Sequence, residues 1–164
     1  MIGIRTFAEE DWQSVWQIME PVIRAGKTYP YARDMQESGA REMWLDIPQQ
    51  TYVATDAAGL LLGTYYIKPN QPSLGAHVAN CGYIVGEAAR GQGVGTAMCE
   101  HSQVEAIRLG YRAMQFNLVV KTNAPSVRLW QKLGFTIVGT LPGAFHHAEE
   151  GYVDAYVMYK LLVS

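Results

Sequence analysis

The sequence predicts an α/β domain in which strand and helix patterns alternate around one core. The 164 residues are enough for a single domain, residues 1–164, with a sizeable buried interior. The hydrophobic content of 49%, the charged content of 17% and the net charge of −2 are those of an ordinary globular protein. These values exclude a disordered chain and a strongly basic nucleic-acid-binding protein. A glycine-rich stretch, residues 90–95, separates an apolar strand pattern from a helix pattern.

The first third of the chain predicts one strand and two helices. Residues 2–6 alternate like a short strand, and the acidic residues at 9–11 suit the first turn of a helix. Apolar side chains then recur at helical spacing up to Gly26. A second helical pattern covers residues 34–46, and Pro48 ends it.

Three strands are predicted in the middle of the chain. Residues 51–55 and 60–68 flank a short turn at 56–59, so these two strands should pair as an antiparallel hairpin. A third strand, residues 77–85, leads into the glycine-rich stretch. That stretch therefore connects a strand to the helix that follows it.

The second half of the chain predicts two helices and three strands. A helix should cover residues 96–110, and a strand should cover residues 114–120. The next helix starts at Asn123, a residue type that favours the cap position, and the last strands are expected at residues 135–139 and 152–162. The expected inner stripe of the first of these helices consists of Ala97, Met98, His101, Val104 and Arg108.

The cysteines and the adjacent histidines carry no predicted chemistry. Cys81 and Cys99 lie in apolar patterns, so we interpret both as packed thiols rather than as nucleophiles or disulfide partners. His146 and His147 lie in a loop expected at residues 141–151, and neighbouring side chains on a loop point apart. The sequence therefore predicts no metal site.

The glycine-rich stretch predicts an anion site. A strand, a glycine turn and a helix start gather unpaired N–H groups at the positive end of a helix dipole, which suits a phosphate. No lysine follows Gly95, so a P-loop is excluded. A dinucleotide fingerprint has the pattern G-x-G-x-x-G. Its third glycine would fall at position 96 when counted from Gly91 and at position 98 when counted from Gly93, but these residues are Thr96 and Met98. That motif is therefore excluded too.

Two motifs together resemble the GNAT superfamily of acetyl-CoA-dependent N-acetyltransferases. The family pattern R/Q-x-x-G-x-G/A is matched by Arg90, Gly93 and Gly95, and the later helix motif is matched by Asn123 and residues 129–135. The resemblance covers nearly the whole chain. It implies a mixed, mostly antiparallel sheet with helices on both faces, acetyl-CoA as the acetyl donor, and an amine as the acceptor.

The resemblance also implies where the cofactor lies. The pyrophosphate would be held by backbone N–H groups of the glycine turn, and the pantetheine arm would pair with free main-chain groups of residues 83–85. An amine would attack the thioester directly, and a main-chain N–H near Tyr83 would stabilise the oxyanion. The implied cofactor-binding residues are Tyr83, Ile84, Val85, Arg90, Gly91, Gln92, Gly93, Val94, Gly95, Thr96, Asn123 and Trp130.

Trp130 departs from the family pattern, in which a tyrosine is the usual acid for the leaving thiolate. An indole cannot donate a proton at neutral pH. Either the thiolate leaves without an acid, or another group serves, and the candidates are Tyr65, Tyr66, His77 and Tyr83.

Three asparagines suggest a narrower resemblance, to the yeast proline-analogue acetyltransferases that act on azetidine-2-carboxylate. In that family two asparagines face the substrate and a third lies near the cofactor, so these roles are carried to Asn80, Asn117 and Asn123. With Tyr83, Asn80 and Asn117 form the expected catalytic group. The alternative is structural, in which Asn80 ends a strand ladder and Asn123 caps a helix.

These observations predict a cytoplasmic enzyme that acetylates the amine of a small metabolite. Dimers are frequent in the resembled family, so the resemblance implies a homodimer. Neither a nucleic acid nor a membrane is expected as a partner. The aromatic segment at residues 29–31 favours a small closed pocket over an open peptide groove. The alternatives are an acetyltransferase for a protein or antibiotic amine, and an idle acyl-CoA-binding sensor, for which Trp130 is the main argument.

Overall fold

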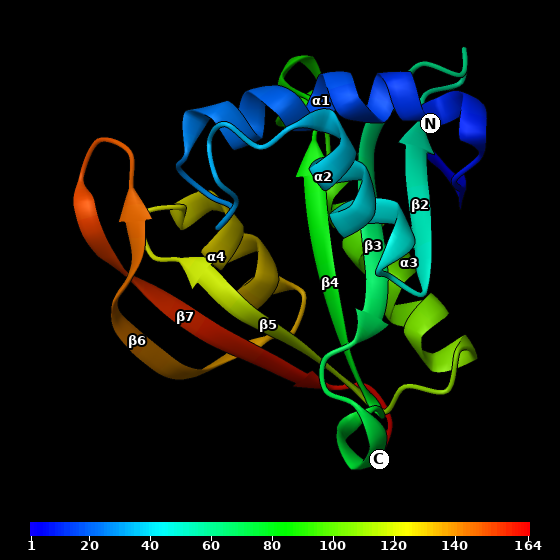
Figure 1. Ribbon diagram of the computed structural model, residues 1–164. Coiled ribbons are helices and arrows are strands. Elements are labelled where there is room, and N and C mark those ends of the chain that lie inside the picture. Colours follow the sequence, from blue (N-terminus) through cyan, green and yellow to red (C-terminus); the bar gives the residue numbers. More distant parts are fainter.

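The computed structural model describes residues 1–164 and contains a seven-stranded sheet with the order β1-β2-β3-β4-β5-β7-β6 (Figure 1). Neighbouring strands are antiparallel except β4 and β5, which are parallel. The expected mixed, mostly antiparallel sheet is therefore confirmed. The strands are β1 (Gly3–Thr6), β2 (Gln50–Thr55), β3 (Leu61–Pro69), β4 (Val78–Val85), β5 (Ala113–Val120), β6 (Thr136–His147) and β7 (Gly151–Leu161).

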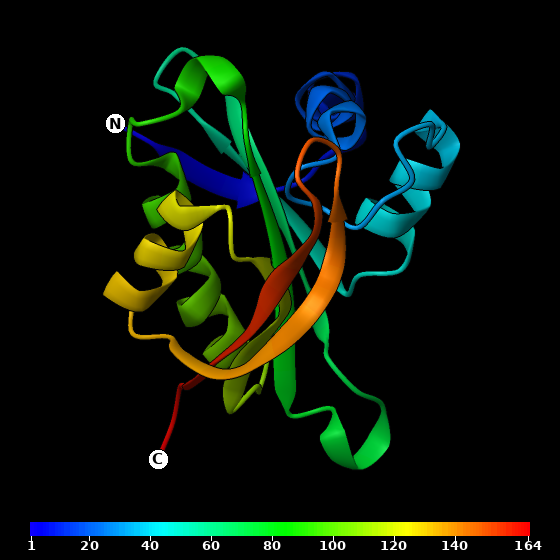
Figure 2. The ribbon, with the colours of Figure 1, turned by 90° about the vertical axis from the view of Figure 1, so that its left-hand side faces the viewer.

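Helices cover both faces of this sheet. Figure 2 shows α1 and α2 on one side and α3 and α4 on the other. Each pair of helices encloses its own hydrophobic cluster against the strands. None of the helices combines the length and the apolar character that crossing a bilayer requires. The helices are α1 (Trp12–Ala25), α2 (Glu37–Arg41), α3 (Val94–Arg108) and α4 (Ala124–Lys132).

Helix α1 forms where the apolar spacing predicts it. Its buried side chains recur every three or four residues, which places them on one face against β3 and β4. Gly26 follows with φ 64°, a left-handed conformation that glycine adopts readily and that ends the helix. The buried side chains of this face are Trp12, Val15, Trp16, Met19 and Ile23.

Strands β4 and β5 separate soon after they start. Their parallel pairing consists of Val78 with Ala113 and Ala79 with Met114, and it does not continue along β4. On its other side β5 pairs with β7 along its length, with a register shift between Phe116 and Val119. Figure 1 shows the upper ends of β4 and β5 diverging. The sheet is therefore split in its centre.

Two segments differ from the sequence prediction. The helix expected at residues 34–46 is shorter, because α2 starts at Glu37 and continues into a π-helical turn, Glu42–Asp46. The loop expected at residues 141–151 is mostly strand, since β6 extends to His147. Bulges interrupt the pairing of β6 with β7, and these irregularities hide the strand period in the sequence.

The inner face of α3 also differs from the expected stripe. Of that stripe only Met98 is buried, whereas Val104 is 67% exposed. Small side chains at Ser102 and Ala106 face the sheet instead and allow the helix to approach it closely. The spacing of apolar residues in the sequence cannot reveal such a face, because serine and alanine contribute little hydrophobicity.

Candidate active site

The split between β4 and β5 contains a cleft with a volume of about 880 Å³. The cleft runs from the start of α3, past the open side of β4, to a wall of aromatic residues from the segment before α2. Every residue expected at the site lines it except Gln92, whose side chain turns back to the carbonyl of Ala88. The lining residues among those expected are Asn80, Tyr83, Ile84, Val85, Arg90, Gly91, Gly93, Val94, Gly95, Thr96, Asn117, Asn123 and Trp130.

Main-chain groups of β4 are free on the side of the cleft. The amide of Gly86 donates to Leu62, and the amide of Asn70 donates to Val78. In an antiparallel ladder bonded residues alternate, so the even-numbered residues of β4 bond β3 and the odd-numbered ones face β5. The amide and carbonyl of Tyr83 therefore face the gap, beyond the last residue that pairs with β5.

One side chain already uses this free edge. The hydroxyl of Tyr29 donates to the carbonyl of Tyr83 at 2.9 Å. Tyr29 belongs to the segment before α2, so this bond ties the aromatic wall of the cleft to β4. The amides of Tyr83 and Val85 remain directed toward the gap. An extended chain lying in the cleft can pair with them as an added strand would.

The end of the cleft at α3 is suited to an anion. Gly91 and Gly93 have φ of 75° and 82°, values that side-chain-bearing residues rarely adopt. The first bond of the helix joins the amide of Ala97 to the carbonyl of Gly93. The amides of Val94, Gly95 and Thr96 are therefore unpaired at the positive end of the helix dipole.

Helix α4 starts at the same end of the cleft. The carbonyl of Asn123 accepts from Val127, but its side chain makes no capping bond, contrary to the cap expected from the sequence. That side chain lines the cleft instead. The two helices lie close together, because a Cβ built on Gly95 would be 3.2 Å from the Leu129 side chain.

Asn80 is buried and bridges the two strands where they begin to separate. Its amide nitrogen donates to the carbonyl of Gln115 on β5 at 3.0 Å. Its oxygen accepts from the hydroxyl of Tyr66 on β3 at 3.2 Å. Asn80 therefore continues the contact of β4 with β5 beyond their main-chain pairing, and it fixes the Tyr66 hydroxyl at the cleft.

Asn117 is exposed at the cleft and belongs to a chain of amides. Its nitrogen donates to the side-chain oxygen of Asn70 at 2.7 Å, and its oxygen accepts from the side chain of Gln115 at 2.9 Å. These bonds hold Asn117 in place across the end of the β3–β4 connection. The interior asparagine of β5 thus has the partners that its unusual position requires.

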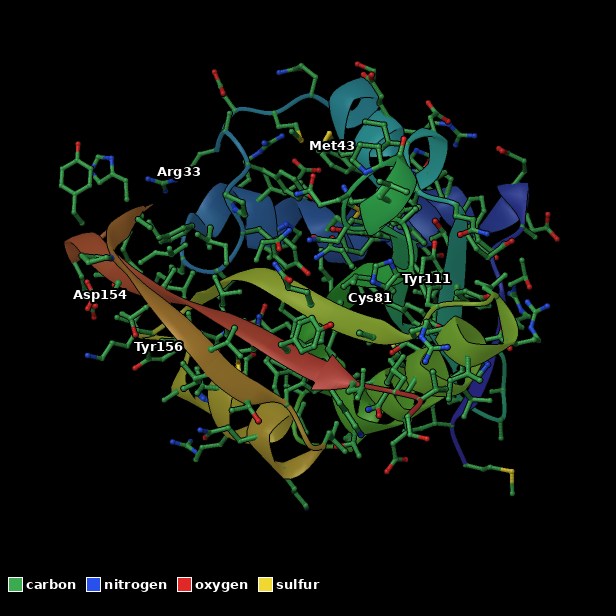
Figure 3. The ribbon with its side chains drawn as sticks, turned by 90° about the horizontal axis from the view of Figure 1, so that it is seen from below. Arg33, Met43, Cys81, Tyr111, Asp154 and Tyr156 are labelled. Atoms are coloured by element: carbon green, nitrogen blue, oxygen red, sulfur yellow. The ribbon has the colours of Figure 1, made fainter.

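Aromatic rings form the wall opposite α3. Tyr29 and Tyr31 stack with ring centroids 5.5 Å apart, and the buried Trp44 packs edge-on behind Tyr66 at 4.8 Å. The Tyr66 ring lies over Gly82, where a Cβ would be 2.4 Å from it. A residue other than glycine at that position would displace the ring. Met43 completes this wall, and Figure 3 shows it on the side of α2.

Comparison with known proteins identifies the family. The sequence model of the Acetyltransferase (GNAT) family matches residues 12–135. The chain belongs to the GNAT family. It is 34% identical over 151 residues to the N-acetyltransferase aca1 of Schizosaccharomyces pombe, covering 82% of this chain and 72% of that protein. GNAT enzymes transfer the acetyl group of acetyl-CoA to an amine acceptor, so the chain is an N-acetyltransferase.

Solved structures agree with this membership. A GCN5-related N-acetyltransferase from Kribbella flavida is 43% identical, covers 98% of this chain and 97% of its own, and superposes with a TM-score of 0.93. A phosphinothricin acetyltransferase from Sinorhizobium meliloti in complex with acetyl-CoA has the same fold at 19% identity. Its TM-score is 0.86, with 99% of this chain and 89% of that chain covered.

The side chain of Tyr83 is engaged beneath the cleft of this GNAT domain. Its hydroxyl lies 2.6 Å from the Ser102 hydroxyl, and burial raises its pKa well above the usual value. Its ring packs against Trp130 with centroids 5.0 Å apart. Of the other groups considered as acids, Tyr66 lines the cleft, whereas His77 does not, and Tyr65 bonds His101 on the α3 side.

No carboxylate or histidine lines the cleft, and its charged residues are Lys68 and Arg90. Burial raises the pKa of Tyr31 to about 12 and the pKa of Tyr29 well above its usual value. Both phenols are therefore protonated at neutral pH. The residues that line the cleft therefore include no carboxylate, histidine or ionised phenol that could act as a base at neutral pH.

The cysteines are free and buried, as expected from the sequence. Figure 3 shows Cys81 inside the body of the molecule. Burial raises the pKa of both thiols, that of Cys99 to about 11, so neither is ionised at neutral pH. His147 lies buried on β6 and accepts from the amides of Glu149 and Glu150. No cluster of three or more His, Cys, Asp or Glu side chains in the structure could hold a metal ion.

Lys68 and Met43 are among the cleft residues that sequence reasoning missed. Lys68 stands opposite Asn80 in the β3–β4 register, and its ammonium lies 5.4 Å from the centroid of the Tyr66 ring. The strand alternation of Tyr66 and Lys68 places both on one face. The sequence contains this spacing, but it does not show that Asn80 lies beside them.

Proposed function

We propose that this GNAT domain transfers the acetyl group of acetyl-CoA to the amine of a small metabolite such as a cyclic amino acid. The observation that carries the proposal is the cleft of about 880 Å³, enclosed at the acceptor end by the Tyr29 and Tyr31 rings. This volume must accommodate the pantetheine arm as well as the acceptor. Sites for small molecules occupy roughly 300–1,000 Å³, so the space left suits a small acceptor.

In this proposal the glycine turn and the two helix starts hold the donor. The unpaired amides of Val94, Gly95 and Thr96 bind the pyrophosphate, with Arg90 as the nearby cation. The pantetheine arm lies along β4 and pairs with the odd-numbered main-chain groups that face the gap. Asn123, whose side chain makes no capping bond, contacts the cofactor, and Trp130 packs beside it.

The chemistry is a direct attack in a ternary complex. The neutral amine attacks the thioester carbonyl carbon, and the carbonyl oxygen becomes an oxyanion that accepts from the amide of Tyr83. Collapse of this intermediate breaks the carbon–sulfur bond and releases the coenzyme A thiolate. A thiol has a pKa of about 8.5, so the thiolate can leave without the tyrosine that Trp130 replaces. The amine proton passes to water.

Asn80 and Asn117 orient the acceptor in this proposal. Asn80 is fixed by hydrogen bonds to β3 and β5, and Asn117 is fixed by its bonds to Asn70 and Gln115. The remaining donor or acceptor capacity of each side chain is therefore held in place. Prepositioned groups lower the entropic cost of bringing an amine to the thioester.

Release of free thiol in the presence of acetyl-CoA and a panel of acceptors tests the proposal. The panel contains small amino acids, cyclic secondary amines, amine antibiotics and peptides with free N-termini or lysines. We expect the largest kcat/KM for a small amine. A preference for peptides or antibiotics would favour the corresponding alternative. Tight acetyl-CoA binding without thiol release for any acceptor would favour an acyl-CoA sensor.

A further inference from the structure

The acceptor end of the cleft carries a positive charge and no negative charge. Lys68 lies there, and no Asp or Glu lines any part of the cleft. The other charged residue, Arg90, belongs to the opposite end, beside the glycine turn. A cationic acceptor group therefore meets an unbalanced positive charge, whereas an anionic group meets a favourable one.

Lys68 is free to bind such a group. Its ammonium makes no hydrogen bond or ion pair with the protein, and its one polar contact is with the face of the Tyr66 ring at 5.4 Å. By contrast, Lys27 is paired with Glu149, and Lys160 donates to Gln103 and to the carbonyl of Leu133. The Lys68 side chain is half-buried and has no carboxylate partner, so an anionic ligand can supply the missing counter-charge.

Neutral donors lie beside this charge. Lys68 pairs in register with Asn80, and the next residues of the connection bring Asn70 against Asn117. These side-chain amides can donate hydrogen bonds without adding negative charge. The Tyr66 ring of the aromatic wall lies beside these groups, with its centroid 5.4 Å from the Lys68 ammonium. The corner offers one cation and several amides on a rigid sheet.

We propose that Lys68 forms an anion subsite and that the acceptor is an amine carrying a carboxylate. This inference rests on the proposed function. The carboxylate binds the Lys68 ammonium while the amine of the same molecule points along β4 toward the thioester. The amides of Asn80 and Asn117 then contact the acceptor between these two points. The subsite discriminates against polyamines, in which the group beyond the reacting amine is a second cation. It also discriminates against lysine side chains of proteins, in which that group is a neutral peptide.

The test compares a small amino acid with its carboxamide, in the native protein and in Lys68→Met. The measured quantity is the ratio of the two kcat/KM values from thiol release. The two amines differ in basicity, but this difference cancels when the ratio in the variant is divided by the ratio in the native protein. A charged hydrogen bond corresponds to about a ten- to hundredfold effect, so the ratio should fall by that factor.

Three controls sharpen the result. Lys68→Arg keeps the charge and should retain most of the preference for the amino acid. Lys121→Met removes an exposed lysine outside the cleft and should leave the ratio unchanged. The affinity for acetyl-CoA, measured by calorimetry, should be the same in all variants because the subsite lies at the acceptor end.

An unchanged ratio in Lys68→Met would overturn the subsite and leave the proposed function intact. If neither the amino acid nor any other small amine is acetylated, the proposed function fails. In that case the affinities of the amino acid and of the carboxamide for the coenzyme A complex, measured by calorimetry, test the subsite independently of turnover. A preference for the amino acid that depends on Lys68 supports it, and equal binding of the two ligands refutes it.

Discussion

Gly82→Ala should disturb the acceptor end through a single added methyl group. A Cβ at this position would lie 2.4 Å from one carbon of the Tyr66 ring and 3.1 Å from the Tyr29 hydroxyl. Carbon atoms prefer separations of about 3.5–4.0 Å, so the ring must move by about 1 Å. The ring cannot move freely, because Trp44 packs against it and its hydroxyl bonds Asn80.

The expected cost follows from this crowding. Overpacking of a dense core costs about 1–3 kcal/mol, so we expect the free energy of unfolding of Gly82→Ala to fall by about 2 kcal/mol. Displacement of Tyr66 and Tyr29 also misplaces the acceptor, and kcat/KM for it should fall about tenfold, equal to about 1.4 kcal/mol. Urea unfolding and acceptor kinetics at saturating acetyl-CoA measure the two effects.

Gly139→Ala is the matched control, since no atom lies within 4 Å of its added Cβ. Gly139 lies on the edge strand β6, far along the sheet from β4 in strand order. The free energy of unfolding of Gly139→Ala should remain within about 0.5 kcal/mol of that of the native protein, as for surface substitutions in general. Equal stability and equal kinetics of the two variants would refute the role given to Gly82.

Three further predictions concern the donor, the acceptor and the proton. Asn117→Ala should lower kcat/KM about tenfold or more without changing the calorimetric affinity for acetyl-CoA, and unchanged kinetics would contradict its role. Gly93→Val and Gly59→Val both place a branched residue at positive φ. Each should lower the free energy of unfolding by about 1–2 kcal/mol. Only Gly93→Val should weaken acetyl-CoA binding. The pH profile of kcat/KM should rise about tenfold per pH unit up to the pKa of the acceptor amine, because no wall group is a base and the pKa of Tyr31 is about 12. A plateau well below the pKa of the amine would reveal a base.

Local patterns in the sequence predicted most of the elements that we propose to hold the donor. The glycine turn, the strand before it and the helix after it follow from chemistry within about twenty residues. The apolar spacing of α1 and the hairpin of β2 and β3 are likewise local signals. Asn117 could be singled out because an asparagine inside a strand needs a partner, and its bond to Asn70 supplies one.

Features that depend on register or on three-dimensional contacts could not be predicted. The neighbours of Lys68 follow from the pairing of β3 with β4, and the aromatic wall follows from the folding of residues 28–36 over β4. Asn123 has the residue type of a cap, yet its side chain lines the cleft. The inner face of α3 was misassigned because Ser102 and Ala106 pack by virtue of their small size rather than their hydrophobicity.

The central claim is acetyl transfer to a small amine in the cleft between β4 and β5. Incubation of the protein with acetyl-CoA and a pool of small amines, followed by mass spectrometry, tests it most directly. We predict one acetylated small amine formed in an amount equal to the coenzyme A released, with less product from Gly93→Val at the same subsaturating acetyl-CoA concentration. Coenzyme A release without any acetylated small amine, or acetylation of added peptides alone, would contradict the claim.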